Sequence, residues 1–308
     1  MHSTVGLITI SEMSTTKMGQ ATVYGLLSLV IITWGFNFSF VKWVISQVPP
    51  IAFNVMRFSF ATLLILIVLT VREGWEPMPA MDVFKMFLLG LLGHSIYQIF
   101  FIKGLSFTTA GNSSLLIATS PIWTALVSAG LKKDEVTRKA WLGILLAFVG
   151  VFLVTLGGGS KLSIASSKTT GDLLTLAAAI ALSLYTVFSR DLLDRYSPLR
   201  LTAITMISGV AGLWIYGGEK VVAQDWTSLS LTSWGAIAYS AVFAIVIGYI
   251  VWFTAVRTVG PTRAAVFNNM TPIVAFSVAF LLLGEPVAWL QVIGGITVIS
   301  GIILTTRN

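Results

Sequence analysis

The chain has 308 residues, of which 56% are hydrophobic and only 10% charged, and its mean hydropathy is +0.90. Soluble domains carry about a quarter charged residues, so this composition excludes an ordinary soluble domain and indicates a chain embedded in a membrane. The sequence contains no cysteine, which excludes disulfides, thiolate metal sites and cysteine nucleophiles. A formal charge of +7 would suit a nucleic-acid partner if the basic residues gathered on one surface, but their distribution predicts no such partner.

Residues 1–19 are polar and lack the pattern of a signal peptide, so we expect them to form a cytoplasmic tail. Ten apolar segments follow, most of them close to the roughly 20 residues that a helix needs to cross about 30 Å of hydrocarbon. These spans are predicted at 21–47, 51–71, 83–103, 109–130, 140–156, 171–190, 198–216, 231–256, 261–283 and 287–305. Glycine and proline pairs such as Gly217-Gly218 and Gly260-Pro261 predict turns between them.

Residues 90–155 match residues 241–306 without a gap at a shift of 151 positions. The match places Pro121 on Pro272, Gly143 on Gly294, and Gly150 on Gly301. A self-match at one fixed period predicts two homologous halves, here 20–157 and 171–308, joined by an outer linker at 158–170. Because each half has five spans, an odd number, the halves must insert in opposite orientations. The expected fold is an all-α membrane protein of ten transmembrane helices, arranged as two inverted five-helix repeats.

Basic residues are distributed unequally between the two sides of the predicted membrane. With a cytoplasmic N-terminus, the inner side carries thirteen of them and the outer side only four, while Lys42 and Arg57 fall within spans. The positive-inside rule therefore predicts that both termini are cytoplasmic. Inverted repeats place a substrate site near the midplane between the halves and support alternating access, so the pattern predicts a transporter.

Polar and aromatic side chains within the spans are the candidate binding residues. His94 either bonds to a neighbouring helix or lines a cavity, where it would contact substrate or sense pH; Tyr97 shares its helical face and Gln98 borders it. Trp34 and Asn37 follow one stripe of the first span and either pack or line a cavity. The remaining candidates, each of which belongs either to the core or to the site, are Trp123, Tyr185, Tyr239, Phe243, Asn268 and Asn269.

Pro121 and Pro272 lie at equivalent depths of the fourth and ninth spans and predict either a fixed kink or a bend that gates the site. Small residues repeat at helical spacing in the fifth and tenth spans and predict a scaffold in which the two helices touch. These ridges are Gly143, Ala147 and Gly150 in one half and Gly294, Val298 and Gly301 in the other.

All twelve acidic residues lie in loops or at the ends of spans, so we expect no coupling through a buried carboxylate. The sequence holds no metal-ligand cluster, phosphate loop or nucleophile–base pair, which predicts that the protein is not an enzyme and takes no metal or cofactor. We also expect the site to lack a mid-membrane charge that could pair with an ionic side chain of a substrate. Neutral and preferably apolar substrates should then be moved best.

Four stretches are typical of one family: residues 97–121 (YQIFFIKGLSFTTAGNSSLLIATSP), the Trp-Gly-Phe-Asn of the first span, the Thr-Pro-Ile of the ninth and the Leu-Gly-Glu-Pro that ends it. With them the chain resembles the drug/metabolite transporter superfamily, in its EamA-like branch. The resemblance implies a small-molecule substrate and a central cavity surrounded by the first, third, fourth, sixth, eighth and ninth spans. It is closest to bacterial aromatic amino-acid exporters of the YddG type. Exporters of nucleotide sugars, purines, quaternary amines or drugs remain alternatives, as does a membrane receptor or sensor, and the oligomeric state, including a monomer, stays open.

Overall fold

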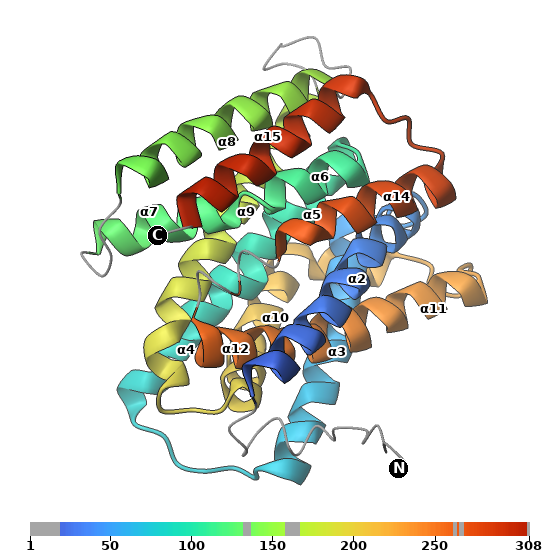
Figure 1. Cartoon of the computed structure of the whole chain (residues 1–308). Coiled ribbons are helices and arrows are strands. Elements are labelled where there is room, and N and C mark those ends of the chain that lie inside the picture. The colour runs from blue at the N-terminus through green and yellow to red at the C-terminus, as the bar shows by residue number, and fades with distance from the viewer. Residues whose placement is uncertain (1–18, 132–136, 158–166, 261–263, 265–267, 307–308) are drawn as a thin grey trace, which may run out of the picture.

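The computed structural model describes residues 19–131, 137–157, 167–260, 264 and 268–306, and every regular element in this part of the chain is a helix. The elements are α2 (Gln20–Val44), α3 (Pro50–Arg72), α4 (Ala80–Gly90), η1 (Leu91–Ile96), α5 (Tyr97–Phe107), α6 (Ala110–Ile117), α7 (Ser120–Gly130), α8 (Arg138–Gly157), α9 (Ser167–Leu193), α10 (Pro198–Ala223), α11 (Leu231–Tyr239), η2 (Ser240–Ile247), α12 (Gly248–Val259), η3 (Asn268–Met270), α14 (Thr271–Leu283) and α15 (Trp289–Thr306). Figure 1 shows them as one helical bundle.

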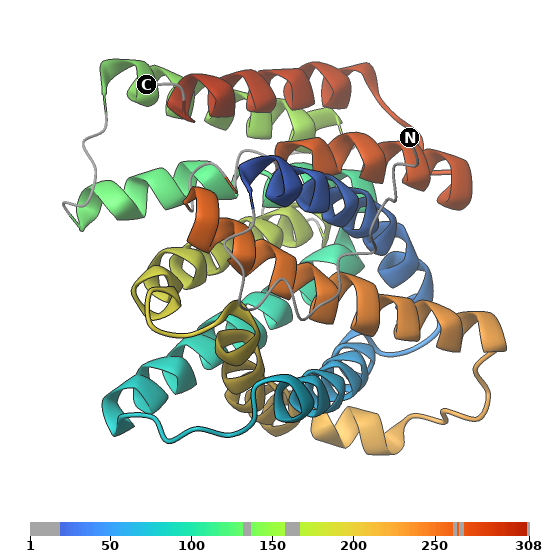
Figure 2. The same cartoon turned by 60° about the horizontal axis from the view of Figure 1, so that its bottom comes forward.

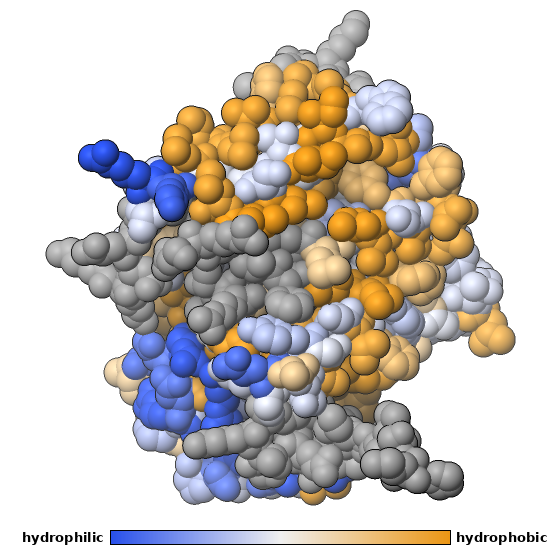
Figure 3. Space-filling view, viewed as in Figure 1, coloured by the Kyte–Doolittle hydropathy of each residue, from blue (hydrophilic) through white to orange (hydrophobic). Residues whose placement is uncertain are grey.

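Within the described residues, seven continuous helical stretches are long and apolar enough to cross a membrane, and three shorter apolar helices complete the ten predicted spans. The shorter ones are Trp141–Val154, Thr271–Leu283 and Trp289–Leu304. Large apolar side chains on α8, α14 and α15 are exposed, and they cover much of the upper face in Figure 3. Such a surface is unstable in water and suits contact with lipid. The prediction of an all-α membrane protein is confirmed.

The two halves interlock around a pseudo-two-fold axis. The second helices of the repeats, α3 and α10, pack against each other, and so do the fifth helices, α8 and α15 (Figures 1 and 2). The first helix of each repeat packs against the third span of the other: α2 against η2 and α12, and α9 against η1 and α5. Each half therefore completes its packing only in the presence of the other.

The glycine ridges of α8 and α15 meet, as the sequence predicts. A Cβ atom added at Gly150 would lie 2.7 Å from the carbonyl oxygen of Gly294, and one added at Gly301 would lie 2.5 Å from that of Gly143. The two backbones can approach this closely only because no side chain separates them. The predicted scaffold contact is confirmed.

The predicted turn at Gly217-Gly218 is wrong, because α10 continues through both glycines to Ala223. A Cβ atom at Gly217 would run into the Cγ2 methyl of Ile51 on α3. The glycine therefore permits close packing of α10 against α3 and does not end the helix. Gly260, with φ of 88°, does end α12, in agreement with the turn predicted there.

Four spans are irregular, in two equivalent pairs. The third and eighth spans each contain a π-helical segment, η1 and η2, at overlapping positions of the repeat. The fourth span is broken between α6 and α7, and in the ninth a short 3₁₀ turn, η3, precedes α14. Pro121 and Pro272 lie in the first turns of α7 and α14, where a proline needs no N–H donor, so they begin helices and do not kink continuous ones. Their gating role stays a prediction.

In each repeat, a basic residue of the first helix donates hydrogen bonds to the C-terminal end of the third span. The Lys42 ammonium donates to the carbonyl oxygens of Leu105 (2.7 Å) and Thr108 (2.5 Å), at the C-terminal end of α5. Arg190 donates in the same way to the carbonyl oxygens of Val256 and Arg257 near the end of α12. A cation at a helix C-terminus is stabilised by the exposed carbonyls and by the helix dipole. These two contacts fix the first helix of each repeat beside the third span that lines the cavity.

Candidate functional site

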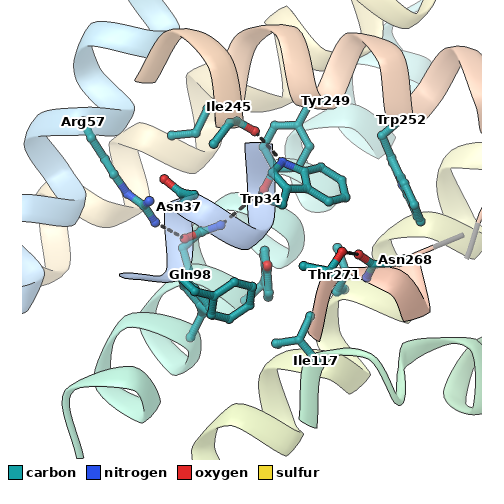
Figure 4. A pocket seen from close by; sticks show the side chains of 15 residues that line it. Trp34, Asn37, Arg57, Gln98, Ile117, Ile245, Tyr249, Trp252, Asn268 and Thr271 are labelled. Carbon is teal, nitrogen blue, oxygen red and sulfur yellow. Dashed lines mark hydrogen bonds between the residues drawn. The ribbon is translucent and has the colours of Figure 1, made fainter. Parts of the chain in front are cut away.

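A cavity lies between the repeats, where the irregular spans converge (Figure 4). Its lining comes from both halves and consists of Trp34, Asn37, Phe38, Arg57, Tyr97, Gln98, Phe101, Ile117, Leu182, Ala244, Ile245, Tyr249, Trp252, Asn268 and Thr271. Discontinuous helices at the interface of two inverted repeats are where transporters hold their substrates. The cavity therefore has the location that a transport site requires.

The cavity is built on equivalent positions of the two repeats. The Gln98 amide donates to the Tyr249 hydroxyl at 3.2 Å, and these residues stand 151 positions apart, which is the period of the internal match. Phe101 and Trp252 are equivalent in the same way and both line the cavity. The repeat axis therefore passes close to the Gln98–Tyr249 hydrogen bond, and the cavity surrounds it.

Arg57 places a positive charge in the cavity wall. Its side chain is 2% exposed, and its guanidinium donates to Asn54 Oδ1 (2.9 Å), Ser240 Oγ (2.8 Å) and Gln98 Oε1 (2.9 Å). All three acceptors are neutral, and no carboxylate pairs with Arg57 among the residues that the structure describes. Buried charges are normally paired, since removing an ion from water is costly. Arg57 therefore departs from that rule at the cavity.

Two further lining residues carry buried polar atoms without a partner in the described part of the chain. These atoms are Asn37 Oδ1, an acceptor, and Trp252 Nε1, a donor. Their side chains are 8% and 4% exposed, so bulk water does not satisfy them well. Unsatisfied buried polar atoms are rare, and each calls for an explanation such as a water, an ion or a ligand. The cavity thus has both acceptor and donor capacity that the protein itself leaves unused.

The cavity is contracted in this structure. Its volume is about 70 Å³, which accommodates a few waters. Loading with a larger molecule requires the lining helices to move apart, and the broken spans beside the cavity are the elements that can absorb such a change.

Five of the residues predicted from sequence lie in the cavity wall: Trp34, Asn37, Tyr97, Gln98 and Asn268. Trp34 Nε1 donates to the carbonyl oxygen of Ala244 at 2.8 Å, which holds its ring 5.6 Å from that of Trp252. Asn268 Oδ1 accepts a hydrogen bond from the Thr271 hydroxyl at 2.8 Å. Their role in binding substrate stays a prediction.

His94 and Tyr185 lie together, but away from the cavity wall. His94 is completely buried, with Nε2 lying 3.0 Å from the Tyr185 hydroxyl and 3.2 Å from Thr205 Oγ1. Its other ring nitrogen has no partner among the described residues. The geometry favours the first of the two interpretations of His94, a contact with neighbouring helices, here α9 and α10.

The other predicted aromatic residues also lie outside the cavity wall. Tyr239 lines a separate groove between α2, α11 and α14, and Phe243, whose ring centre lies 5.5 Å from that of Tyr239, is half exposed. Trp123 packs against Phe148 of α8 at 5.5 Å. The side chain of Asn269 lies outside the described residues.

The expectation of a site without a mid-membrane charge is wrong, because Arg57 lines the cavity. The signal was present in the sequence: an arginine within an apolar span is rare in membranes and marks a functional site by default. Tyr249, Trp252 and Thr271 also line the cavity without having been predicted as site residues. Tyr249 could have been found through the repeat, since it is the counterpart of Gln98.

Within the described residues, no group of three or more histidine, aspartate or glutamate side chains is arranged to hold a metal ion. The buried Asp172 lies at the start of α9, away from the cavity wall, and accepts a hydrogen bond from the Thr108 hydroxyl at 2.6 Å. The polar groups of the cavity are therefore an arginine, amides, hydroxyls and indoles. This set can bind a small polar or anionic group, and aromatic rings around it can hold an apolar body.

Comparison with known proteins agrees with this architecture. Residues 21–156 and 169–307 each match the EamA-like transporter family. The chain is 29% identical over 287 residues to the uncharacterized transporter YyaM of Bacillus subtilis, an alignment that covers 93% of this chain and 94% of that protein. It is 30% identical over 284 residues to an uncharacterized transporter of Archaeoglobus fulgidus, covering 92% of this chain and 96% of the relative.

One relative has a name that specifies a substrate. A probable terminal-alkyne amino-acid exporter of Streptantibioticus cattleyicolor is 25% identical over 282 residues, which cover 92% of each chain. A solved crystal structure superposes with a TM-score of 0.68 at 16% identity, covering 92% of this chain and 98% of the other. At that identity the superposition shows a shared fold alone.

Proposed function

The chain belongs to the EamA-like transporter family, and on that premise we propose that it exports small metabolites, foremost neutral and aromatic amino acids. In this proposal the two repeats rock against each other, so that the central cavity opens alternately to the two sides of a bacterial inner membrane. The protein is a multi-pass membrane transporter; the substrate, the direction and the mechanism are what we propose.

The observation that carries the proposal is the composition of the cavity wall. The rings of Trp34, Phe101 and Trp252 provide apolar and aromatic contact surface, while the amides of Asn37 and Gln98 provide polar contacts at one end (Figure 4). A few well-placed polar groups in a mainly apolar wall are typical of sites for small molecules. The amino-acid exporter among the relatives supports the same class of substrate.

Transport into proteoliposomes tests the proposal. We expect radiolabelled phenylalanine or methionine to accumulate faster than glutamate or lysine, because the wall offers more apolar surface than charge. The same vesicles should be offered a nucleotide sugar and a panel of drugs. Faster movement of glutamate or lysine, or of a member of that panel, than of phenylalanine would contradict the proposed substrate class.

The orientation can be tested separately, because the chain has no cysteine of its own. In the proposed topology Lys161→Cys and Lys220→Cys label from outside intact cells with an impermeant maleimide, whereas Lys133→Cys and Arg195→Cys do not. A membrane-permeant maleimide should label all four and serves as the control. Labelling of all four by the impermeant reagent would exclude opposite orientations of the repeats.

A further inference from the structure

We propose that Arg57 is the anion subsite of the central cavity and that the substrate carries a carboxylate which pairs with its guanidinium; this inference rests on the proposed transport function and specifies its substrate class. The cargo is then a monocarboxylate with an apolar body, such as the zwitterion of a neutral amino acid. A cationic drug lacks the anionic group that this subsite requires.

The first argument is the missing counter-charge. Each of the three guanidinium nitrogens donates one hydrogen bond to a neutral oxygen, which leaves a second N–H on each terminal nitrogen. The rings of Phe53 and Phe58 lie 5.1 and 5.4 Å from its central carbon and offer only their π faces to the charge. A carboxylate would provide both the missing negative charge and two acceptors at a suitable spacing.

The second argument is that Arg57 is held rigidly and faces the cavity. Asn54 on α3, Ser240 on η2 and Gln98 on α5 fix the guanidinium from three elements, and Gln98 is fixed in turn by Tyr249. In Figure 4 the head of Arg57 lies beside Asn37 and Gln98, at the opposite end of the cavity from Trp252 and Asn268. A side chain preorganised in this way loses little entropy on binding a ligand.

The third argument is that the remaining unpartnered atoms fit an amino acid. Asn37 Oδ1, beside Arg57, is an acceptor without a partner and can receive a hydrogen bond from a ligand ammonium. The body of the ligand then extends toward the rings of Trp34 and Trp252, with the orphaned indole N–H of Trp252 left for a polar group or a water. The carboxylate contributes most to recognition because it alone neutralises a buried charge.

Binding of a matched series of ligands tests the proposal on the intact protein in detergent micelles. The probes are L-phenylalanine, L-phenylalaninamide, 3-phenylpropionate and phenethylamine, measured by isothermal titration calorimetry. We expect the two carboxylates to bind at least about tenfold more tightly than the amide and the amine, the effect of a lost charge-assisted hydrogen bond. Equal binding of phenylalanine and its amide, or no binding of either carboxylate at millimolar concentration, overturns the proposal.

Two variants separate the charge from the shape of the cavity. Gln98→Glu places a carboxylate of nearly the same shape 2.9 Å from the guanidinium, so the protein supplies its own counter-ion. Arg57→Gln removes the charge. Both should lose the preference for carboxylates, while Arg72→Gln, an exposed site on the same helix, should retain it. If Arg57→Gln does not fold, the Gln98→Glu variant and the wild-type ligand series still test the proposal. A preference for carboxylates that survives in Gln98→Glu overturns it.

Two further outcomes distinguish this inference from the proposed function. If proteoliposomes do not transport phenylalanine but the wild-type preference for 3-phenylpropionate over phenethylamine holds, amino-acid export fails and the carboxylate subsite stands. If sodium chloride or inorganic phosphate displaces 3-phenylpropionate at equal concentration, Arg57 binds inorganic anions and the inference is wrong.

Discussion

Two buried polar clusters stand at related places in the two repeats, and only one of them reaches the cavity. The cavity cluster consists of Arg57 with Asn54, Gln98 and Ser240, and the closed cluster consists of His94 with Tyr185 and Thr205. The second helix of each repeat begins at a proline, Pro50 in α3 and Pro198 in α10. Counted from these prolines, Arg57 and Thr205 occupy the same position.

The clusters differ in charge and in access to the cavity. In the closed cluster His94, Tyr185 and Thr205 bond to one another, and Phe58 and Tyr249 pack around the imidazole. In the cavity cluster the arginine keeps donors and a whole charge that no described residue neutralises. In a duplicated fold, a polar residue can thus join helices in one repeat while its counterpart in the other repeat is available to bind a ligand. What distinguishes the two is that only the cavity cluster opens onto the cavity.

The largest effect should come from removing the charge of the cavity cluster. Arg57→Gln is expected to slow phenylalanine transport at least roughly 30-fold, since losing one partner of a buried charge pair costs about 2 kcal/mol or more. Initial rates in proteoliposomes measure this, with Arg72→Gln as the matched control. Equal rates in the two variants would remove the functional distinction between the clusters.

The closed cluster should respond in stability and not in selectivity. His94→Leu removes one hydrogen-bond partner from each of the Tyr185 and Thr205 hydroxyls, which keep their bond to each other, and is expected to destabilise the fold by about 1–3 kcal/mol. His94→Gln retains a donor and an acceptor and should lie closer to the parent. Unfolding in a denaturing detergent measures the first effect, and the ratio of phenylalanine to phenylalaninamide binding measures the second. A changed ratio in His94→Leu would bring His94 into the binding site and revive the pH-sensing role considered from the sequence.

The packing around the closed cluster can be tested without changing a polar group. A Cβ atom at Gly209 on α10 would collide with the Cβ of His94, whereas one at Gly235 on α11 would meet no atom within 4 Å. We expect Gly209→Ala to destabilise by about 1–3 kcal/mol through overpacking, and Gly235→Ala to be neutral or slightly stabilising. Thermal unfolding of the pair measures the difference, and similar melting temperatures would show that the cluster is loosely packed.

The smallest effect concerns a partly buried polar contact far from both clusters, and it gives a scale for the other three. Tyr196, between α9 and α10, donates a hydrogen bond to Asp82 of α4 at 2.7 Å, and this bond raises the pKa of the Tyr196 phenol. Its contribution to stability is therefore present below the usual tyrosine pKa of about 10 and is lost as pH rises through the raised value. Tyr196→Phe should lower the melting temperature slightly at pH about 7 and by less at pH about 11. A loss of the same size at both would show that the bond contributes nothing.

Much of the fold followed from local patterns. The ten spans, the duplication and the contact between the glycine ridges were predicted because apolar length, repeat period and small-residue spacing are visible along a single chain. The wrong turn at Gly217-Gly218 shows the limit of such reasoning. A glycine pair looks the same in the sequence whether it ends a helix or allows another helix to approach. Here Gly217 allows the close approach of Ile51 on α3, and α10 continues.

The candidate site followed less completely. Trp34, Asn37, Tyr97, Gln98 and Asn268 line the cavity as predicted, whereas His94 and Tyr185 face other helices. Sequence spacing tells which residues share a face of one helix, but not which neighbour that face meets. The π segments η1 and η2 shift the faces of the third and eighth spans further, and an ideal helical period does not anticipate them.

The sequence by itself determined that the chain is a membrane protein with ten spans and two homologous halves. Each of these follows from the length of the apolar segments or from the period at which the sequence repeats. The tertiary structure alone decided that Arg57 and not His94 opens onto the cavity. That choice depends on how α3, α5 and η2 rotate and close around one side chain, while α9 and α10 close around the other. A buried polar residue becomes a structural contact or a binding group according to which neighbours surround it, and those neighbours come from distant parts of the chain.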